Sequence, residues 1–408
     1  MDTATASPRL ADSVSADAKP SILIVGAYDL DGRIELMKEL GGRFQMAAAG
    51  NVPHFRAAFE DAGFRYDHYP LSRRLNPAAD VMTLAALVRL FRSRRPDVVH
   101  AFATKPSVFA RLAARITGVP VVIGAIPGLG SLYTNNDVTT RTVRGCYETI
   151  QRLASYVSDL TIFQIKEDAR QFLDAGVVSE DKAIVIPGSG VRTNLFDPAR
   201  FSQSDRQRVR AELGIRADVT LIVMVSRLLR SKGLLQFAGA AETIRKRCPS
   251  VAFLLVGADD EESMDQLRRE ELSQVAQKVN WVGVRNDIPA VLAASDIFAL
   301  PSYYREGIPR VLIEAASMGL PIVTTDSPGC NDVVVHGVNG LLVPPRDQDG
   351  LAHAILRLVE EPELRRRFGV ASRQRAVDRF DLVSIAGQIG AIYADLLASK
   401  GLLPSEAR

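Results

Sequence analysis

The chain has 408 residues, of which 47% are apolar and 24% charged, and its formal net charge is +3. These ordinary globular values favour two domains with large cores that need neither metal nor disulfide to hold them. The three cysteines, Cys146, Cys248 and Cys330, lie far apart and form no CxxC pair. This spacing argues for a reduced, cytoplasmic protein and against a disulfide scaffold or a zinc site.

Residues 1–20 are predicted to form a disordered leader, because they are small and polar and contain several aspartates. No basic segment precedes an apolar one there, which excludes a signal peptide. Nowhere do about 18 uncharged apolar residues run together, so no transmembrane helix is expected.

Short apolar runs rich in β-branched residues alternate with longer amphipathic segments from residue 21 onward. This alternation predicts an α/β fold in which a parallel sheet is covered on both faces by helices. The strands predicted in the first half are 21–25, 97–100, 119–123, 159–163 and 183–187, and the helices include 79–94 and 105–117.

The pattern restarts after Leu195-Phe-Asp-Pro198, which has the composition of an interdomain linker. We therefore expect a Rossmann-like domain at 21–198 and a second one at 199–380. A C-terminal segment, 381–408, contains an amphipathic helix that packs back on the first domain. The strands predicted in the second half are 219–225, 251–256, 279–282, 296–300 and 320–324. Because such sheets bind ligands at the carboxyl ends of their strands, two facing sheets predict a deep interdomain cleft.

The segment from Tyr304 to Pro321 carries two carboxylates after a predicted strand. Pro309 suits the first turn of a helix, which leaves Glu306 in the preceding loop and Glu314 inside the helix. Eight helical residues rise about 12 Å, so the carboxylates are expected to bind separate hydroxyls of one elongated ligand. The N–H groups at the helix start would face an anionic group between them. The alternative is an acidic helix terminus plus one exposed Glu.

Arg227 and Lys232 flank a loop that follows the predicted strand 219–225 and opens a helix at about Gly233. Two cations at the carboxyl end of a strand are suited to neutralise a diphosphate leaving group. An isolated basic loop is more often solvated surface, but its place relative to the strand and to the Glu segment favours a functional interpretation.

Arg227…Lys232 and Glu306-x7-Glu314 together resemble the paired signature of family 4 retaining glycosyltransferases of the GT-B fold. The likeness covers nearly the whole chain from Ser21. It implies two Rossmann-like domains with parallel sheets that face the cleft where the donor binds. Arg227 and Lys232 would then bind the donor diphosphate, Glu306 the transferred sugar and Glu314 the ribose hydroxyls.

The same resemblance assigns further donor contacts. Backbone at Gly307, Ile308 and Pro309 would line the sugar-phosphate pocket, and Asn286 falls in the region that usually meets the base. Residues 328–332 resemble the family's following loop, with Asp332 where the family usually carries Glu.

His100-Ala-Phe-Ala-Thr-Lys-Pro106 and Gly128-Leu-Gly130 resemble transferases that extend undecaprenyl-diphosphate-linked sugars in bacterial surface-polysaccharide pathways. Many relatives carry a second His two positions after the first, where this chain has Phe102. His100 is the candidate for a catalytic contact to the donor sugar, with a structural histidine as the alternative. Lys105 is the candidate for an acceptor phosphate.

The implied function is retaining transfer of a hexosyl or N-acetylhexosaminyl group from a nucleotide sugar, UDP rather than GDP, to a lipid-diphosphate-linked sugar. Retention in this family is attributed to same-face attack assisted by the departing phosphate, which leaves the protein to position groups and to stabilise the leaving group. The alternatives are a sugar-nucleotide epimerase or phosphorylase, a non-catalytic nucleotide-sugar-binding subunit, and a dehydrogenase. The last is disfavoured because the chain has no GxGxxG fingerprint.

No cofactor, metal or nucleic-acid partner is expected. Tyr28-Asp-Leu-Asp31 contains an Asp-x-Asp string that binds metal–nucleotide complexes in other transferases. Here it is interpreted as a loop after the first strand, since the two-domain architecture does not require a metal.

The first half also carries excess positive charge: from Arg33 to Arg115 there are 14 Lys/Arg and 7 Asp/Glu. The helix 79–94 has an apolar stripe at Leu84, Leu87, Val88 and Phe91, and basic residues flank it at Arg73, Arg74, Arg89, Arg92, Arg94 and Arg95. In one interpretation the stripe packs on the sheet and the arginines favour the helix end. In the other, the arginines also meet anionic headgroups, which would place the protein on the cytoplasmic face of the inner membrane.

Overall fold

The computed structural model describes residues 19–72, 76–133, 137–259, 263 and 265–403. Most of the predicted leader, and both Arg73 and Arg74, lie outside these residues.

Two parallel sheets form the framework, and both have the same strand order. The first is ordered β3-β2-β1-β4-β5-β6-β7 and the second β10-β9-β8-β11-β12-β13. If the strands of each half are numbered from one, both sheets contain the order 3-2-1-4-5-6, which is the doubly wound Rossmann order, and the first sheet adds a seventh strand at its end. The first-sheet strands are β1 (Ser21–Val25), β2 (Gln45–Gly50), β3 (Arg65–His68), β4 (Val98–Ala101), β5 (Val121–Ile126), β6 (Leu160–Phe163) and β7 (Ala183–Val185). Those of the second are β8 (Thr220–Val225), β9 (Val251–Val256), β10 (Asn280–Trp281), β11 (Ile297–Leu300), β12 (Ile322–Thr325) and β13 (Gly340–Val343).

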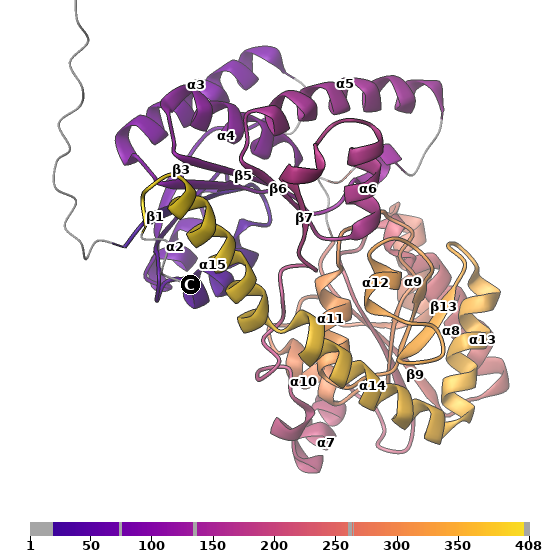
Figure 1. Ribbon diagram of the computed structural model, residues 1–408. Helices are drawn as coiled ribbons and strands as arrows, with labels where there is room; N and C mark the ends of the chain where they lie inside the picture. Colours follow the sequence, from indigo (N-terminus) through magenta and orange to yellow (C-terminus); the bar gives the residue numbers. More distant parts are fainter. Residues whose placement is uncertain (1–18, 73–75, 134–136, 260–262, 264, 404–408) are drawn as a thin grey trace, which may run out of the picture.

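Helices connect the strands and cover the sheets (Figure 1). In the first half they are α1 (Ile34–Leu40), α2 (Phe55–Asp61), α3 (Pro77–Arg94), α4 (Thr104–Thr117), α5 (Val138–Tyr156) and α6 (Lys166–Asp174). In the second half they are α7 (Gln203–Glu212), α8 (Leu234–Arg247), α9 (Arg269–Lys278), α10 (Ile288–Ala293), α11 (Arg310–Ser317), α12 (Cys330–Val333), α13 (Gln348–Glu360) and α14 (Pro362–Phe380). Short 3-10 turns lie at 30–33, 130–133, 180–182, 198–200 and 230–232.

The C-terminal helix α15 (Leu382–Ser399) belongs to the first half in space (Figure 1). Its buried side chains, including Ile385 and Tyr393, join the core formed by β1, β4, β5 and α1. By length and composition α15 is the one helix among the described residues that could cross a membrane, with a mean hydropathy of 1.4. Its apolar side is instead part of the first-domain core.

The strand order fixes where a ligand can bind. In each sheet the order reverses beside the first strand, between β1 and β4 and between β8 and β11. Loops leaving neighbouring strands on either side of a reversal turn to opposite faces, which opens a crevice at their carboxyl ends. The carboxyl end of β4 and the loops after β8 and β11 therefore lie at the two crevices, and they carry His100, Lys232 and Glu306.

Sequence patterns missed three strands and misplaced one helix start. β2 consists of Gln-Met-Ala-Ala-Ala-Gly and lacks β-branched residues, while β3 is a polar edge strand. β13 was also not predicted. Pro309 does not lie in the first turn of its helix, because α11 begins at Arg310 and Pro309 is the residue that caps it. Glu306 lies in the loop before α11, and only Arg310 to Glu314 of the interval is helical.

Candidate active site

Lys232 and Glu306 are brought together although 74 positions separate them in the chain. The Lys232 ammonium lies 2.6 Å from one carboxylate oxygen of Glu306, and Ser302 donates a hydrogen bond of 3.0 Å to the other. Both partners of the ion pair are largely buried, with side-chain exposures of 13% and 19%. The pair joins the loops after β8 and β11, so a cation and a carboxylate face one another across the crevice of the second sheet.

The chain can make this approach because a glycine follows Lys232. Gly233 has a φ of +80° and ends the 3-10 turn that carries the lysine. A Cβ at this position would lie 2.2 Å from the carbonyl oxygen of Pro301. Only glycine combines this backbone conformation with so close a contact to the loop that follows β11.

Glu314 lies on the buried side of α11 and is 8% exposed. Its Oε1 accepts a hydrogen bond of 3.0 Å from Arg310 Nε, and Arg310 also reaches the Gly32 carbonyl of the first domain at 3.4 Å. Burial raises the pKa of Glu314, and the charge of Arg310 opposes that rise. The sequence alternative of an exposed glutamate is therefore wrong, because this carboxylate is desolvated and held by one arginine.

The start of α11 offers backbone N–H groups to the same crevice. The N-cap, Pro309, makes no side-chain hydrogen bond to the first turn, so the first-turn N–H groups keep their donor capacity and their positive dipole. The backbone N–H of Ile308 donates to Gln164 Oε1 of the first domain at 2.9 Å. Gly307, Ile308 and Pro309 are buried where the two domains meet.

His100 is buried at the carboxyl end of β4 in the first domain. Its Nδ1 is hydrogen-bonded to the Tyr393 hydroxyl at 2.7 Å, and its ring stacks on Phe102 with centroids 4.2 Å apart. Its Nε2 has no hydrogen-bond partner among the described residues. Desolvation, with a smaller contribution from Arg33, lowers the pKa of His100 to about 3, so the ring is neutral at physiological pH.

Arg33 is a buried cation beside His100. It lies over the Phe102 ring at 4.4 Å and is hydrogen-bonded to Ser189, while its nearest carboxylate, Asp29, is 3.9 Å away. Arg33, His100, Phe102 and Gln164 line a cavity of about 20 Å³, which has room for about one water molecule. Phe102 is thus the aromatic platform on which the Arg33 guanidinium lies.

The two domains touch at the Glu306 loop. A Cβ on Gly128 would lie 2.4 Å from the backbone nitrogen of Gly307, and Gly130 N–H donates to the Arg305 carbonyl at 3.0 Å. Arg305 also forms an ion pair with buried Asp168 at 2.9 Å. The first domain therefore contacts the loop that carries Glu306 through backbone and through a buried ion pair.

Beside these contacts lies an open pocket of about 380 Å³. It is lined by Tyr133 of the first domain and by loops that follow β11, β12 and β13, including Arg305, Ser327 and Arg346. A pocket of this size accommodates a small organic ligand such as a sugar ring.

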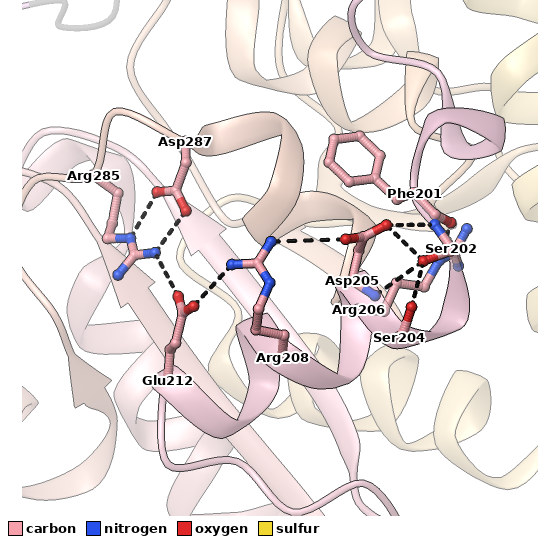
Figure 2. A network of polar contacts seen from close by, with 9 residues as sticks. All are labelled: Phe201, Ser202, Ser204, Asp205, Arg206, Arg208, Glu212, Arg285 and Asp287. Carbon is pink, nitrogen blue, oxygen red and sulfur yellow. Dashed lines mark hydrogen bonds and ion pairs between the residues drawn. The ribbon is translucent and has the colours of Figure 1, made fainter.

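Two donor candidates lie at the surface. Arg227 follows β8 and is exposed, and Asn286 is exposed in the loop before α10. The loop around Asn286 is anchored, because Arg285 binds Asp287 through two hydrogen bonds of 2.8 and 2.6 Å and reaches Glu212 of α7 at 3.8 Å (Figure 2). The same network continues along α7 to its Ser202 cap.

Lys105 does not face the cations and carboxylates of the second domain. It lies in the first turn of α4, forms an ion pair of 2.6 Å with Asp80 of α3, and donates to the Ser72 carbonyl. Asp332, which stands where the family usually has Glu, accepts from the Gly329 N–H at 3.1 Å and caps α12. In the described ranges no three His, Cys, Asp or Glu side chains are grouped to hold a metal ion.

Comparison with known proteins identifies the family. Residues 34–188 match the family described as "Glycosyl transferase 4-like domain", and residues 205–375 match "Glycosyl transferases group 1". The chain belongs to the family 4 (group 1) glycosyltransferases. This glycosyltransferase has the GT-B fold and uses a nucleotide-sugar donor.

Two curated relatives match most of this chain and most of their own length. A UDP-Gal:alpha-D-GlcNAc-diphosphoundecaprenol alpha-1,3-galactosyltransferase of Escherichia coli is 29% identical, over 81% of this chain and 83% of that protein. An N,N'-diacetylbacillosaminyl-diphospho-undecaprenol alpha-1,3-N-acetylgalactosaminyltransferase of Campylobacter jejuni is 28% identical, over 78% and 82%. Among solved structures, Anabaena HepE in complex with UDP is 23% identical, with a TM-score of 0.74 over 92% of this chain and 100% of that one.

Sequence reasoning missed Gln164, Asp168 and Arg305, which join the domains of the glycosyltransferase, and it also missed Arg33 beside His100. A usable signal existed for three of them. Gln164 directly follows β6, Asp168 lies in the next turn of α6, and Arg33 follows β1, all at carboxyl ends of strands of the first sheet. Arg305 precedes Glu306 in the chain, but no feature of the sequence indicates that it pairs with the first domain.

Proposed function

We propose that the enzyme is a retaining transferase that moves a hexosyl or N-acetylhexosaminyl group from a UDP-sugar to a lipid-diphosphate-linked sugar. The observation that carries the proposal is the row of charged groups at the crevice of the second sheet, with Lys232 against Glu306 and buried Glu314 one helix segment away. These groups offer one partner to each part of a nucleotide sugar: Glu306 to the sugar, Lys232 to the diphosphate and Glu314 to the ribose. The names of the two undecaprenol-diphosphate relatives support the acceptor class.

Each candidate side chain has a role in this proposal. Lys232 and Arg227 neutralise charge that develops on the departing diphosphate, aided by the N–H groups at the start of α11. Glu306 orients hydroxyls of the sugar, and Glu314 binds the ribose. Neutral His100 offers Nε2 to the sugar from the first domain, while Asn286 contacts the base and Lys105 is the acceptor-phosphate candidate.

Transfer should need no divalent ion, because the cations and the helix start supply the positive charge that a metal supplies elsewhere. We therefore expect activity to persist in EDTA. Activity that disappears in EDTA and returns with magnesium or manganese would make Asp29 and Asp31 metal ligands. A lipid-linked acceptor also implies that the enzyme works from the cytoplasm at an anionic membrane surface.

The decisive experiment is a panel of UDP- and GDP-sugars tested against synthetic polyprenyl-diphosphate-linked sugars, with product anomers read by NMR. Product of inverted configuration, or transfer to sugars that carry no prenyl diphosphate, contradicts the proposal. Arg227→Ala and Lys232→Ala should each lower turnover by about 10²-fold, the scale for loss of one positioned electrostatic group. Near-normal turnover in either variant would exclude its role at the diphosphate.

A further inference from the structure

Helix α5 has an apolar side that no other part of the described chain covers. Five of its large apolar side chains are exposed, by 42 to 81%, and Cys146 is exposed between them. These side chains are Val138, Val143, Ile150, Leu153 and Tyr156. Val143, Cys146, Ile150 and Leu153 follow the i, i+3, i+7, i+10 spacing of one helix face. Singly exposed apolar residues need no explanation, but a row of about 15 Å on one helix face, from Val143 to Leu153, does.

The neighbouring helices α3 and α4 also expose apolar side chains. Figure 1 shows α3, α4 and α5 along the same side of the first sheet, away from the second domain. α3 exposes Val81 and Met82 by 67% and 62%, and α4 exposes Ile116 by 57%. The apolar stripe that sequence analysis assigned to α3 is not part of this exposed set, because Leu87 and Phe91 are buried in the core beneath.

The exposed charged side chains of the three helices are all positive. Within their bounds the exposed charged residues are Arg89, Arg92, Arg115, Arg141 and Arg152. Their two carboxylates, Asp80 and Glu148, are half-buried and are bonded to Lys105 and to Tyr133. Arg94 is not available, since it pairs with Asp67 at 2.5 Å. The surface is therefore apolar and cationic.

An apolar and cationic surface fits an anionic membrane better than a second copy of the chain. In a two-fold dimer through α5 the same patch would meet itself and bring like charges together. A bilayer with anionic headgroups instead receives apolar side chains at the acyl boundary and arginines at the phosphates. We propose that α5 is the helix through which the protein docks on an anionic membrane, with Val143, Ile150 and Leu153 inserted below the headgroups.

The inner side of α5, opposite the exposed row, contacts a residue that lines the interdomain pocket. Tyr133, which lines that pocket, donates a hydrogen bond of 2.8 Å to Glu148 of α5, and the Arg144 guanidinium lies over its ring at 4.9 Å. A polyprenyl diphosphate held in the bilayer at α5 would then be separated from that pocket by about 10 Å, the diameter of one helix. This consequence, unlike the docking itself, rests on the proposed acceptor.

The test is sedimentation with phosphatidylcholine vesicles, with and without phosphatidylglycerol, at low and high salt. Wild type should bind only the anionic vesicles and lose binding at high salt. Val143→Glu with Ile150→Glu should lower the partition coefficient by about tenfold or more. The matched control is Val370→Glu with Val377→Glu on α14, whose residues have the same spacing and exposures of 63% and 39%. It should bind as wild type does.

Cys146 gives a second measurement on an otherwise unchanged surface. In a Cys248→Ser background, an environment-sensitive fluorophore on Cys146 should shift to the blue on anionic vesicles and be shielded from an aqueous quencher. Arg92→Gln with Arg141→Gln should weaken binding, by about fivefold for each arginine removed. Equal binding to neutral vesicles, an unshifted fluorophore, or an Ile150-dependent dimer without vesicle binding would overturn the proposal.

The two proposals fail separately. Variants on α5 should still transfer sugar to a short-chain, water-soluble acceptor diphosphate at the wild-type rate. Vesicle binding without any transfer to lipid diphosphates would leave docking in place and contradict the proposed acceptor. Transfer to the soluble acceptor without vesicle binding would contradict docking alone.

Discussion

His100 shows how burial sets the chemistry of a single side chain. Its ring lies between Phe102, Tyr393 and Arg33, and its pKa of about 3 keeps it neutral while its Nε2 remains a potential partner for a hydroxyl. A proton on this ring would be close to a buried guanidinium. The residue therefore suits hydrogen bonding better than proton transfer.

The burial of neutral His100 should make the free energy of unfolding depend on pH. The unfolded chain binds a proton on His100 below about pH 6.5, whereas the folded chain does so only near pH 3. The unfolded state thus holds more protons in this window, and the free energy of unfolding rises with pH through it. His100→Gln removes the term, so the advantage of wild type over the variant in urea unfolding should grow from acidic to neutral pH. An advantage that is constant with pH would contradict a buried neutral histidine.

The two glutamates should separate in binding experiments. Glu314→Gln should weaken free UDP by about tenfold or more, the scale of one lost charged hydrogen bond. Glu306→Gln should leave UDP affinity intact or tighter, because it releases Lys232 from its ion pair, and should slow transfer. Calorimetry with UDP measures both, with exposed Glu363→Gln on α14 as the control. Equal losses of UDP affinity in both variants would show that the ribose and the sugar are not divided between Glu314 and Glu306 as proposed.

At the scale of elements, the sequence predicted what local composition determines. β1, β8 and β9 are runs of Ile, Leu and Val that are buried on both faces, and their patterns were read directly. β2 could not be found this way, because its alanines reach strand conformation only by pairing with β1 and β3. β3 is an edge strand of sequence Arg-Tyr-Asp-His, in which apolar and polar residues do not alternate clearly. Its place follows from the sheet and not from its own residues.

Asp381 connects two elements and should be a sensitive position. It caps α15 by accepting from the N–H groups of Val383 and Ser384, and its other oxygen is hydrogen-bonded to Thr193. Asp381→Ala should lower the free energy of unfolding by about 1–2 kcal/mol, since a capping side chain is lost. Urea denaturation provides the measurement. Asp381→Asn keeps a capping oxygen and should recover most of the loss, and a full loss in that variant would place the effect in the charge.

At the scale of the molecule, the candidate site joins residues that are distant in sequence. Local motifs located Lys232, Glu306 and Glu314, because each follows a strand or lies in a recognisable helix. The contacts of Ile308 with Gln164 and of Arg305 with Asp168 span 144 and 137 positions. No spacing rule reaches so far, and these pairs exist only because two independently wound sheets meet at one loop.

The contact between the first domain and the Glu306 loop should matter for sugar transfer and not for UDP binding. Gly128 and Gly307 approach so closely that a Cβ on Gly128 would lie 2.4 Å from a backbone nitrogen and 2.8 Å from the Glu306 carbonyl carbon. Backbone atoms on both sides cannot yield as a flexible side chain would, so Gly128→Ala must separate the first domain from the Glu306 loop. The diphosphate and ribose candidates all lie in the second domain. UDP affinity should therefore survive while transfer, which needs His100 beside the sugar, falls by an order of magnitude or more.

Calorimetry with UDP and a transfer assay on the same preparation separate the two effects. Gly387→Ala is the matched control, because a Cβ there meets nothing within 4 Å. Small-angle scattering should show a larger radius of gyration for Gly128→Ala than for the control, since the domains can no longer meet at the loop. If Gly128→Ala keeps wild-type turnover, contact between Gly128 and Gly307 is not required in the reacting conformation. A loss of UDP affinity in that variant would instead show that the first domain contributes directly to the nucleotide site.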